Sequence, residues 1–200
     1  MLKIAEKLND LSFGKLMEVY IEGNLENGQE LWPEEPEARQ IALAEQEFYN
    51  YLQQVFFRTP GARYLIWEEA GHYVSALRLE PYRDGLLLEA LETAPDKRKK
   101  GYAAQLVQAT LEYAGNVKIY SHVGKYNTVS LRTHEKCGFT RIHDYAVYAD
   151  GSVNERSYTM LYCITGLNAF PVGADAHIGP AEKCRVSYCG PMWASAPTGL

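Results

Sequence analysis

The hydrophobic periodicity of this chain changes from helical to strand-like at residues 59–61, which read Thr-Pro-Gly. Upstream of that change, apolar residues recur at helical spacing over residues 10–22 and 38–57, and a segment bearing Gly, Asn and Pro separates the two stretches, from Gly23 to Pro36. The sequence therefore predicts two helices joined by an irregular segment. A short first strand at residues 2–4 is an open alternative.

Short β-rich runs alternate with helical segments downstream of that change. The predicted strands cover residues 64–67, 73–79, 86–93, 117–123, 140–148 and 156–163. The predicted helices cover residues 101–113 and 127–136. Strands that meander at both ends of a pattern and alternate with helices in its middle are typical of a mixed sheet. The sequence thus predicts an α/β (α+β) fold with a mixed central sheet of six to seven strands and helices on both faces.

The length of the chain allows one domain. Its 200 residues, 46% of them apolar, can bury one core and are too few for two ordinary domains. From residue 165 onward the pattern dissolves into Gly, Pro, Ala and isolated aromatics. We therefore expect one domain over residues 1–163 and an irregular C-terminal tail over residues 164–200.

The charge balance argues against one class of partner and favours another. The chain carries 20 Lys and Arg against 25 Asp and Glu, a formal net charge of -5. Nucleic-acid binders usually show a basic excess on some face, so no nucleic-acid partner is expected. Cationic small substrates are favoured electrostatically.

The cysteines and the apolar runs indicate the compartment. The first thirty residues lack the uninterrupted apolar core of a signal peptide, and no apolar run approaches transmembrane length, so no membrane partner is expected. Four unevenly placed cysteines do not make a disulfide scaffold. Cys184 and Cys189, with His177 nearby, match no common zinc spacing, so no metal is expected either. These observations favour a cytoplasmic protein.

The segment Pro-Asp-Lys-Arg-Lys-Lys-Gly-Tyr-Ala at residues 95–103 stands between a predicted strand and the start of a predicted helix. A glycine in the first turn of a helix lets a ligand approach the backbone, and the unpaired N–H groups there form an anion site. The basic run 97–100 adds positive charge to a chain that is otherwise acidic. The segment is neither a P-loop nor a dinucleotide fingerprint. Taken by itself it fits either a pyrophosphate site or a solvated basic loop.

A second segment, at residues 127–139, reads Asn-Thr-Val-Ser-Leu-Arg-Thr-His-Glu-Lys-Cys-Gly-Phe. The two segments resemble motifs A and B of the GNAT N-acetyltransferase family, in the family's order and at its usual separation. The motif A pattern Arg/Gln-x-x-Gly-x-Gly/Ala is met by Arg98, Gly101 and Ala103. The resemblance spans roughly residues 62–162.

The resemblance implies a GNAT fold in which the strand before motif A and the following strand splay apart at an acyl-CoA site. The backbone from Arg98 to Ala104 would hold the CoA pyrophosphate, and the backbones of Leu91 and Thr93 would pair with the pantetheine arm. Asn127 would hydrogen-bond the pantetheine or its neighbouring backbone. The cofactor-binding residues implied in this way are Leu91, Thr93, Arg98, Lys99, Lys100, Gly101, Tyr102, Ala103, Ala104 and Asn127.

The chemistry of such enzymes requires a route for the amine proton. Glu89 and Glu92 are the acidic residues of the strand that leads to motif A, and strand spacing turns them to opposite faces unless a bulge intervenes. We expect only one of them to reach the substrate and favour Glu89 as the catalytic base. Leu87 occupies the position where the family often has an acid.

The family's proton donor to the departing thiolate is a tyrosine of motif B, and here that position holds His134. A histidine donates a proton only while it is protonated, and its ordinary pKa near 6.5 leaves it mostly neutral at physiological pH. We name His134 as the candidate acid. Tyr126 and Tyr145 are alternatives, with His134 then structural.

The resemblance implies an N-acetyltransferase that transfers the acetyl group of acetyl-CoA to a primary amine by direct attack. The acceptor is expected to be cationic, and Trp32, Tyr49 and Tyr148 are candidates to line its pocket. The alternative is a catalytically inactive acyl-CoA-binding module, suggested by His134 and Leu87. A monomer and a homodimer are both compatible with the sequence.

Overall fold

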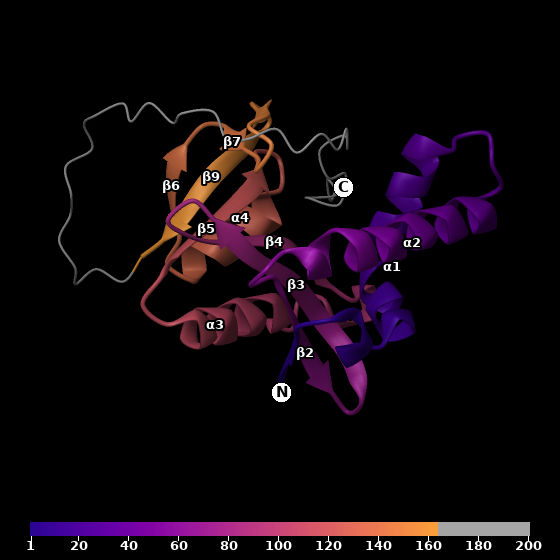
Figure 1. Ribbon diagram of the computed structural model, residues 1–200, viewed down its shortest axis with the longest axis horizontal. Coiled ribbons are helices and arrows are strands. Elements are labelled where there is room, and N and C mark those ends of the chain that lie inside the picture. Colours follow the sequence, from indigo (N-terminus) through magenta and orange to yellow (C-terminus); the bar gives the residue numbers. More distant parts are fainter. Residues whose placement is uncertain (164–200) are drawn as a thin grey trace.

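The computed structural model describes residues 1–163 (Figure 1). The tail expected over residues 164–200 lies outside the described residues, as do Cys184, Cys189 and His177. In the part that is described, the chain forms a mixed sheet flanked by helices.

The sheet has seven strands in the order β1-β2-β3-β4-β5-β9-β6, and β7 and β8 form a separate pair. The strands are β1 (Leu2–Ala5), β2 (Arg63–Glu69), β3 (His72–Tyr82), β4 (Gly85–Thr93), β5 (Lys118–Gly124), β6 (Thr140–His143), β7 (Ala146–Val147), β8 (Val153–Asn154) and β9 (Ser157–Tyr162). The helices are α1 (Phe13–Leu31), α2 (Glu37–Gln54), α3 (Tyr102–Ala114) and α4 (Thr128–Lys136), with short 3-10 turns η1 (Leu8–Asp10), η2 (Phe56–Arg58) and η3 (Pro95–Lys97). Among the strands of residues 1–163, only β4 and β5 pair in parallel, because α3 carries the chain between them. The prediction of a mixed sheet of six to seven strands is confirmed.

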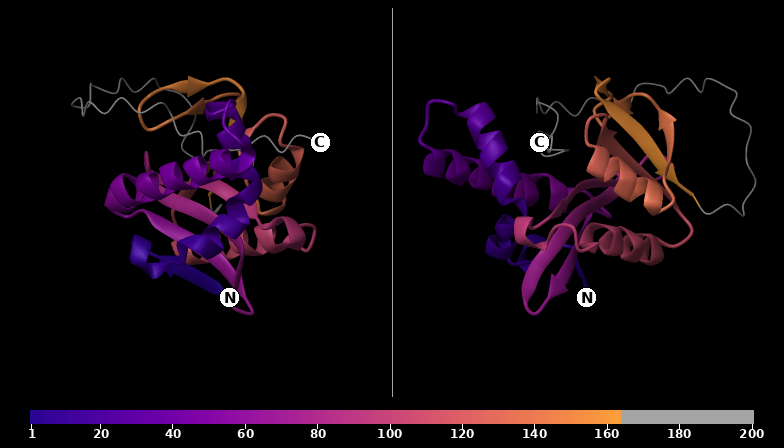
Figure 2. Two further views of the ribbon diagram at one scale, coloured as in Figure 1. Left: turned by 90° about the vertical axis from the view of Figure 1, so that its right-hand side faces the viewer. Right: turned by 180° about the vertical axis from the view of Figure 1, so that it is seen from behind.

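Helices cover both faces of the sheet, as the sequence predicted. Along β2, Tyr64 and Ile66 belong to the apolar cluster formed with α1 and α2, whereas Leu65 belongs to the cluster formed with α3 and α4. This alternation follows from the two-residue period of a strand. The ends of α1 and α2 joined by residues 32–36 project away from the sheet (Figures 1 and 2).

The first helix is longer than the sequence predicted. The prediction ended it at residue 22 and made Gly23 to Pro36 irregular, whereas α1 continues to Leu31. The reason is packing against α2: a Cβ at Gly28 would lie 2.7 Å from the carbonyl carbon of Gln40. A glycine is therefore required where the two helix backbones meet. Asn24 and Asn27, which favour loops by propensity, are buried inside the same helix.

Gly28→Ala is expected to lower the thermal midpoint, because the new methyl group overlaps the backbone of Gln40 and separates α1 from α2. Overpacking of this kind typically costs about 1–3 kcal/mol. Gly14→Ala is the matched control in the same helix, since a Cβ there meets nothing within 4 Å. The control should leave stability unchanged or raise it by up to about 1 kcal/mol through helix propensity. Thermal unfolding followed by circular dichroism measures both, and equal midpoints would contradict the packing argument.

The strand predicted over residues 140–148 is in fact two strands. β6 pairs with β9, and the register shifts between Arg141 and His143. The chain then turns away from the sheet, and β7 pairs with β8 instead. One stretch of chain that the sequence presents as a single strand thus pairs with two different partners.

Candidate active site

The centre of the site is the place where β4 and β5 separate. Their parallel register runs from the pair Gly85 and Lys118 to the pair Leu88 and Ser121, where it ends. Beyond this point β4 continues along β3 to Thr93, and β5 continues along β9 to Gly124. The splay predicted from the resemblance is therefore present in the middle of the sheet.

A cavity of about 50 Å³ lies at this splay. Its walls come from α1, β4, β5 and α4, and include Asn24, Asn27, Glu89, Leu91, Glu92, Ser121, His122, Asn127, Ser130 and His134. Of the residues suggested for the acceptor pocket, Trp32 and Tyr49 do not line this cavity, while Tyr148 contacts the cavity residue His122 edge to face, at 5.5 Å between ring centroids.

A β-bulge in β4 turns both glutamates toward the cavity. Ala76 of β3 is paired with Glu92, and Arg78 with Glu89, so that two steps along β3 match three along β4. Ala90 takes up the extra residue with a φ of 51°. Regular strand spacing would turn the two glutamates to opposite faces, and the bulge restores the second to the same side, so both line the cavity.

Glu89 is a buried carboxylate with a charged partner. Its Oε2 lies 3.5 Å from Nη2 of Arg78, and its Oε1 lies 4.0 Å from Nδ1 of His122. Arg78 is 1% exposed and stacks over the Tyr51 ring at 4.9 Å. Burial raises the pKa of Glu89 above its ordinary value, and the Arg78 guanidinium opposes that rise. The group is thus a stronger base than a solvated carboxylate, as a proton acceptor at neutral pH requires.

Glu92 is the second carboxylate of the cavity, and its surroundings are acidic. Burial, with Glu26 and Glu22 nearby, raises the pKa of Glu92 to about 7, and Arg98 opposes the rise. Nη1 of Arg98 lies 2.5 Å from Glu22 of α1, and Nη2 lies 3.9 Å from Glu92. Its Nε donates to the carbonyl oxygen of Thr93 at 3.2 Å. The side chain of Arg98 therefore ties motif A to the acidic face of α1, which leaves its backbone for a pyrophosphate.

The start of α3 has the geometry of an anion site. Gly101 is the N-cap residue with a φ of 85°, and Lys99 before it has a φ of 62°. A Cβ at Gly101 would meet nothing within 4 Å, so the space above the loop is open. The N–H groups of the first helical turn, from Tyr102 to Ala104, have no partner within the helix and carry the positive end of its dipole. Lys99 and Lys100 are exposed beside them.

Asn127 has a structural function in addition to its position at the cavity. Its Oδ1 accepts a hydrogen bond from the backbone N–H of Ser130 at 2.9 Å and so caps α4. Its amide nitrogen is left for a ligand.

His134 lies in the cavity wall and is held as a neutral ring. Its Nδ1 is 2.8 Å from the carbonyl oxygen of Ser130, which can only accept, so Nδ1 carries the proton. Nε2 is then the acceptor for the hydroxyl of Ser121 at 3.0 Å. Burial lowers the pKa of His134 below its ordinary value. His134 in this state accepts a proton before it can donate one.

The two tyrosines named as alternatives to His134 do not line the cavity. Tyr126 is 88% exposed and Tyr145 is 42% exposed. Tyr145 stacks on His143, at 5.3 Å between ring centroids. The cavity therefore offers His134 and Ser121, rather than either tyrosine, to a leaving group.

The two cavity residues of β5 are among those that the sequence did not reveal. His122 is buried between Tyr82 and Tyr148, with 5.5 Å between its ring centroid and that of each tyrosine. Both ring nitrogens of His122 lack a hydrogen-bond partner. Burial lowers the pKa of His122 to about 4. Ser121, next to it, bonds to His134. In the sequence both read as ordinary strand residues, and only the separation of β4 from β5 makes them part of a site.

Comparisons with known proteins agree with this geometry. The sequence profile of the Acetyltransferase (GNAT) family matches residues 25–139. The fold is similar to that of an N-acetyltransferase, PaiA, of Thermoplasma acidophilum in complex with coenzyme A, at 15% identity and a TM-score of 0.56, covering 82% of this chain and 99% of that one. No curated protein matches the chain.

A spermidine N-acetyltransferase of Vibrio cholerae in complex with CoA and spermine is also similar, at 21% identity and a TM-score of 0.50, covering 81% of this chain and 95% of that one. A chimera of that enzyme and hSSAT gives a TM-score of 0.51 at the same identity and coverage. At these identities the likeness is one of fold.

Residues 1–163 contain no group of three or more His, Cys, Asp or Glu side chains placed to hold a metal ion. None of the helices described there has the length and apolarity needed to cross a bilayer.

The family profile covers more than half of the chain, and the splayed strands and the open helix start at motif A are in place. The chain belongs to the GNAT acetyltransferase family.

Proposed function

We propose that this protein transfers the acetyl group of acetyl-CoA to a cationic primary amine by direct attack of the amine on the thioester. The observation that carries the proposal is the cavity at the splay, which brings two carboxylates with raised pKa values next to the gap between β4 and β5. An ammonium group must lose a proton before it attacks, and a base close to neutral pKa is suited to that task.

The acyl donor would enter along β4. Past Leu88 this strand has no β5 partner, so the backbones of Leu91 and Thr93 would meet the pantetheine amides, with the carbonyl oxygen of Thr93 also accepting from Nε of Arg98. The pyrophosphate would lie at the N–H groups that follow Gly101, with Lys99 and Lys100 beside it. Asn127 would contribute its amide nitrogen from the opposite wall.

The acceptor would enter from the side of α1. Glu22, Glu26 and Glu92 gather there against the single guanidinium of Arg98. One arginine among three carboxylates leaves room for a further positive charge. Spermine, bound in the Vibrio cholerae structure, is a polycation of this kind, and polyamines are therefore the first acceptors to test.

Proton transfer would use both walls of the cavity. Glu89 would take the amine proton, directly or through a water molecule. His134 stays the candidate for the proton delivered to sulfur, and its neutral state means that it must first take a proton, for which Ser121 provides the hydrogen-bonded path.

The direct test is a screen of amine acceptors with acetyl-CoA, read by release of free thiol. Thiol release that depends on a cationic amine supports the proposal. The replacement of the family's tyrosine by His134 favours one other function, an acyl-CoA-binding module without catalysis. Calorimetric binding of acetyl-CoA without thiol release from any acceptor would establish that alternative.

The affinity for a cationic acceptor is expected to rise as pH increases through about 7, because Glu92 is neutral below its pKa and negative above it. The groups facing Glu92 are Arg98, Glu22 and Glu26, and an alkylammonium with a pKa near 10.4 stays charged throughout this range. The KM for the acceptor should fall by about tenfold from the low-pH limit to the high-pH limit of the profile, which corresponds to about 1.4 kcal/mol. Glu92→Gln should remove this pH dependence, and an unchanged profile in that variant would contradict the assignment.

A further inference from the structure

Ser121 and His134 form a hydrogen-bonded pair to which acetyl transfer by direct attack assigns proton movement alone, with no covalent role for the hydroxyl of Ser121. The hydroxyl oxygen of Ser121 lies 3.0 Å from Nε2 of His134, and both side chains are buried in the wall of the cavity. The carbonyl oxygen of Ser130 fixes the proton on Nδ1 of the ring, at 2.8 Å. Nε2 is therefore the basic nitrogen, and the serine proton points at it.

Three other buried hydroxyl groups have a backbone carbonyl oxygen as their partner. Ser75 donates to the carbonyl oxygen of Glu92, Thr110 to that of Leu106, and Thr159 to that of Tyr145. A carbonyl oxygen cannot take the proton away, whereas a neutral imidazole can. The arrangement at Ser121 is that of a serine with an adjacent general base whose orientation a third group fixes.

The pair lies at the end of the junction between β4 and β5. Ser121 belongs to the last residue pair that β5 makes with β4, so it lies where the gap between the strands begins. The cavity residues on β4 run from Leu88, the partner of Ser121, to Glu92. An acyl group carried along β4 as proposed above would reach the cavity at this end of the gap.

The geometry points to Ser121 as a nucleophile, activated by His134, that accepts the acyl group of an acyl thioester when no amine occupies the cavity. The result is a second activity of the same site, hydrolysis of acetyl-CoA through an acetyl-serine. This inference rests on the proposed function, because it requires the thioester to enter the gap between β4 and β5.

The step balances with water as the one co-reactant. The Oγ–C bond of Ser121 forms as the C–S bond of the thioester breaks, and the serine proton moves to Nε2 of His134 and from there to the departing sulfur. This leaves acetyl-Ser121, a free thiol and a neutral imidazole. Water then attacks the ester carbonyl, its proton returns through Nε2 to Oγ of Ser121, and acetic acid leaves. An amine in the cavity intercepts the thioester before Ser121 does.

The test uses the full chain with acetyl-CoA and no amine. Thiol release is followed in time, and samples quenched in acid are digested and examined by mass spectrometry for an acetyl group on the peptide that contains Ser121. Ser121→Ala and His134→Phe should lower the thiol release by about 10²-fold, the size of effect expected on loss of a nucleophile or its base. Ser121→Cys should regain an acyl-enzyme, as a thioester. Ser157→Ala, which removes a buried hydroxyl of β9 outside the cavity, is the matched control and should behave as the wild type.

An acetyl group on Ser121, or thiol release that depends on Ser121, supports the inference. Absence of both overturns it, and the proposed function is unaffected if the same preparation still binds acetyl-CoA and acetylates an amine. If acetyl-CoA does not bind at all, the proposed function fails. In that case p-nitrophenyl acetate, which needs no CoA site, decides whether Ser121 is a nucleophile. If the protein hydrolyses this ester and Ser121 carries no acetyl group, the inference is rejected.

Discussion

Gly101→Glu is expected to abolish acetyl-CoA binding while leaving residues 1–163 folded. Gly101 stands at the start of α3, where the first-turn N–H groups and the helix dipole favour an anion. A glutamate there places a negative charge in the open space above the loop, which a Cβ enters without meeting any atom within 4 Å. Loss of affinity by more than about 10²-fold, equivalent to more than about 2.7 kcal/mol, is expected in calorimetry.

The control variant must carry the same conformational strain at a glycine with positive φ. Gly101 has a φ of 85°, and Gly151, in the turn between β7 and β8, has a φ of 84° and equally open surroundings. A glutamate at either position pays a similar penalty for a left-handed conformation. Gly151→Glu should thus match Gly101→Glu in thermal midpoint and retain acetyl-CoA binding. Undiminished binding by Gly101→Glu would move the pyrophosphate site away from motif A.

Glu89→Gln is expected to lower kcat by about 10²- to 10³-fold, within the range for removal of a general base. The substitution keeps the shape of the side chain and removes its ability to take a proton. It also leaves Arg78, which is 1% exposed, without its carboxylate at 3.5 Å. Removing one partner of a buried pair is strongly destabilising, so the thermal midpoint should fall as well. Steady-state kinetics on samples shown to be folded at the assay temperature separate the two effects.

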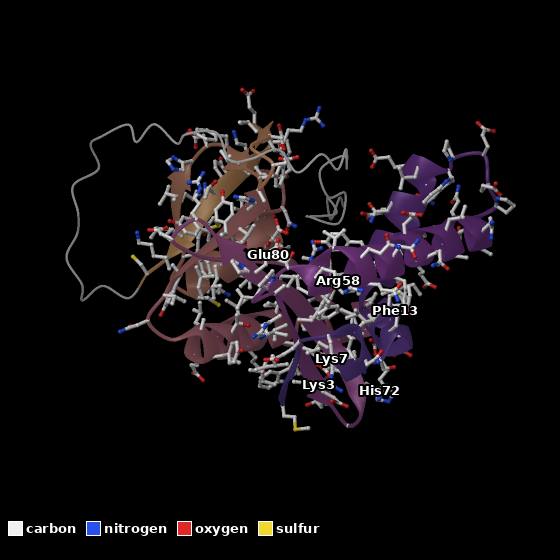
Figure 3. The ribbon with its side chains drawn as sticks, in the orientation of Figure 1. Lys3, Lys7, Phe13, Arg58, His72 and Glu80 are labelled. Atoms are coloured by element: carbon white, nitrogen blue, oxygen red, sulfur yellow. The ribbon has the colours of Figure 1, made fainter. Side chains whose placement is uncertain are left out.

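Glu80→Gln is the matched control for Glu89. Glu80 is a second partly buried glutamate near Arg78, on β3 instead of β4, and it does not line the cavity. Figure 3 shows Glu80 and His72 at opposite ends of that strand. The control should cost some stability and leave kcat within about threefold of the wild type. A normal kcat in Glu89→Gln would transfer the role of base to Glu92 or to solvent.

The parts of the site that depend on local backbone signals could be predicted from the sequence. Gly101 and Asn127 mark helix starts, and their surroundings in the chain are enough to place them. The length of α1 could not be predicted, since Gly28 is compatible with a helix there only because Gln40 packs against it. The bulge at Ala90 escaped for a similar reason: no turn residue marks it, and its register is set by β3.

Residues that become functional through long-range contacts were harder still to find. Ser121 and His122 lie in a strand with apolar residues on either side, so nothing in the local sequence distinguishes them as site residues. They line the cavity because β5 loses its pairing with β4 after Leu88. The sequence of one strand does not show where its pairing with a neighbouring strand ends. His134 was found only because the resemblance assigned a role to its position, and its protonation state required the carbonyl group of Ser130.

The short junction between β4 and β5 has a consequence for how this fold tolerates change. Four residue pairs join the two halves of the sheet, where a continuous ladder would give more. The gap between the strands thus costs the sheet hydrogen bonds, and the helical layers packed on either face must supply the missing stability. Substitutions that extend the pairing past Leu88 would strengthen the sheet and close the entrance. Selection for robustness and selection for turnover therefore oppose each other at this junction.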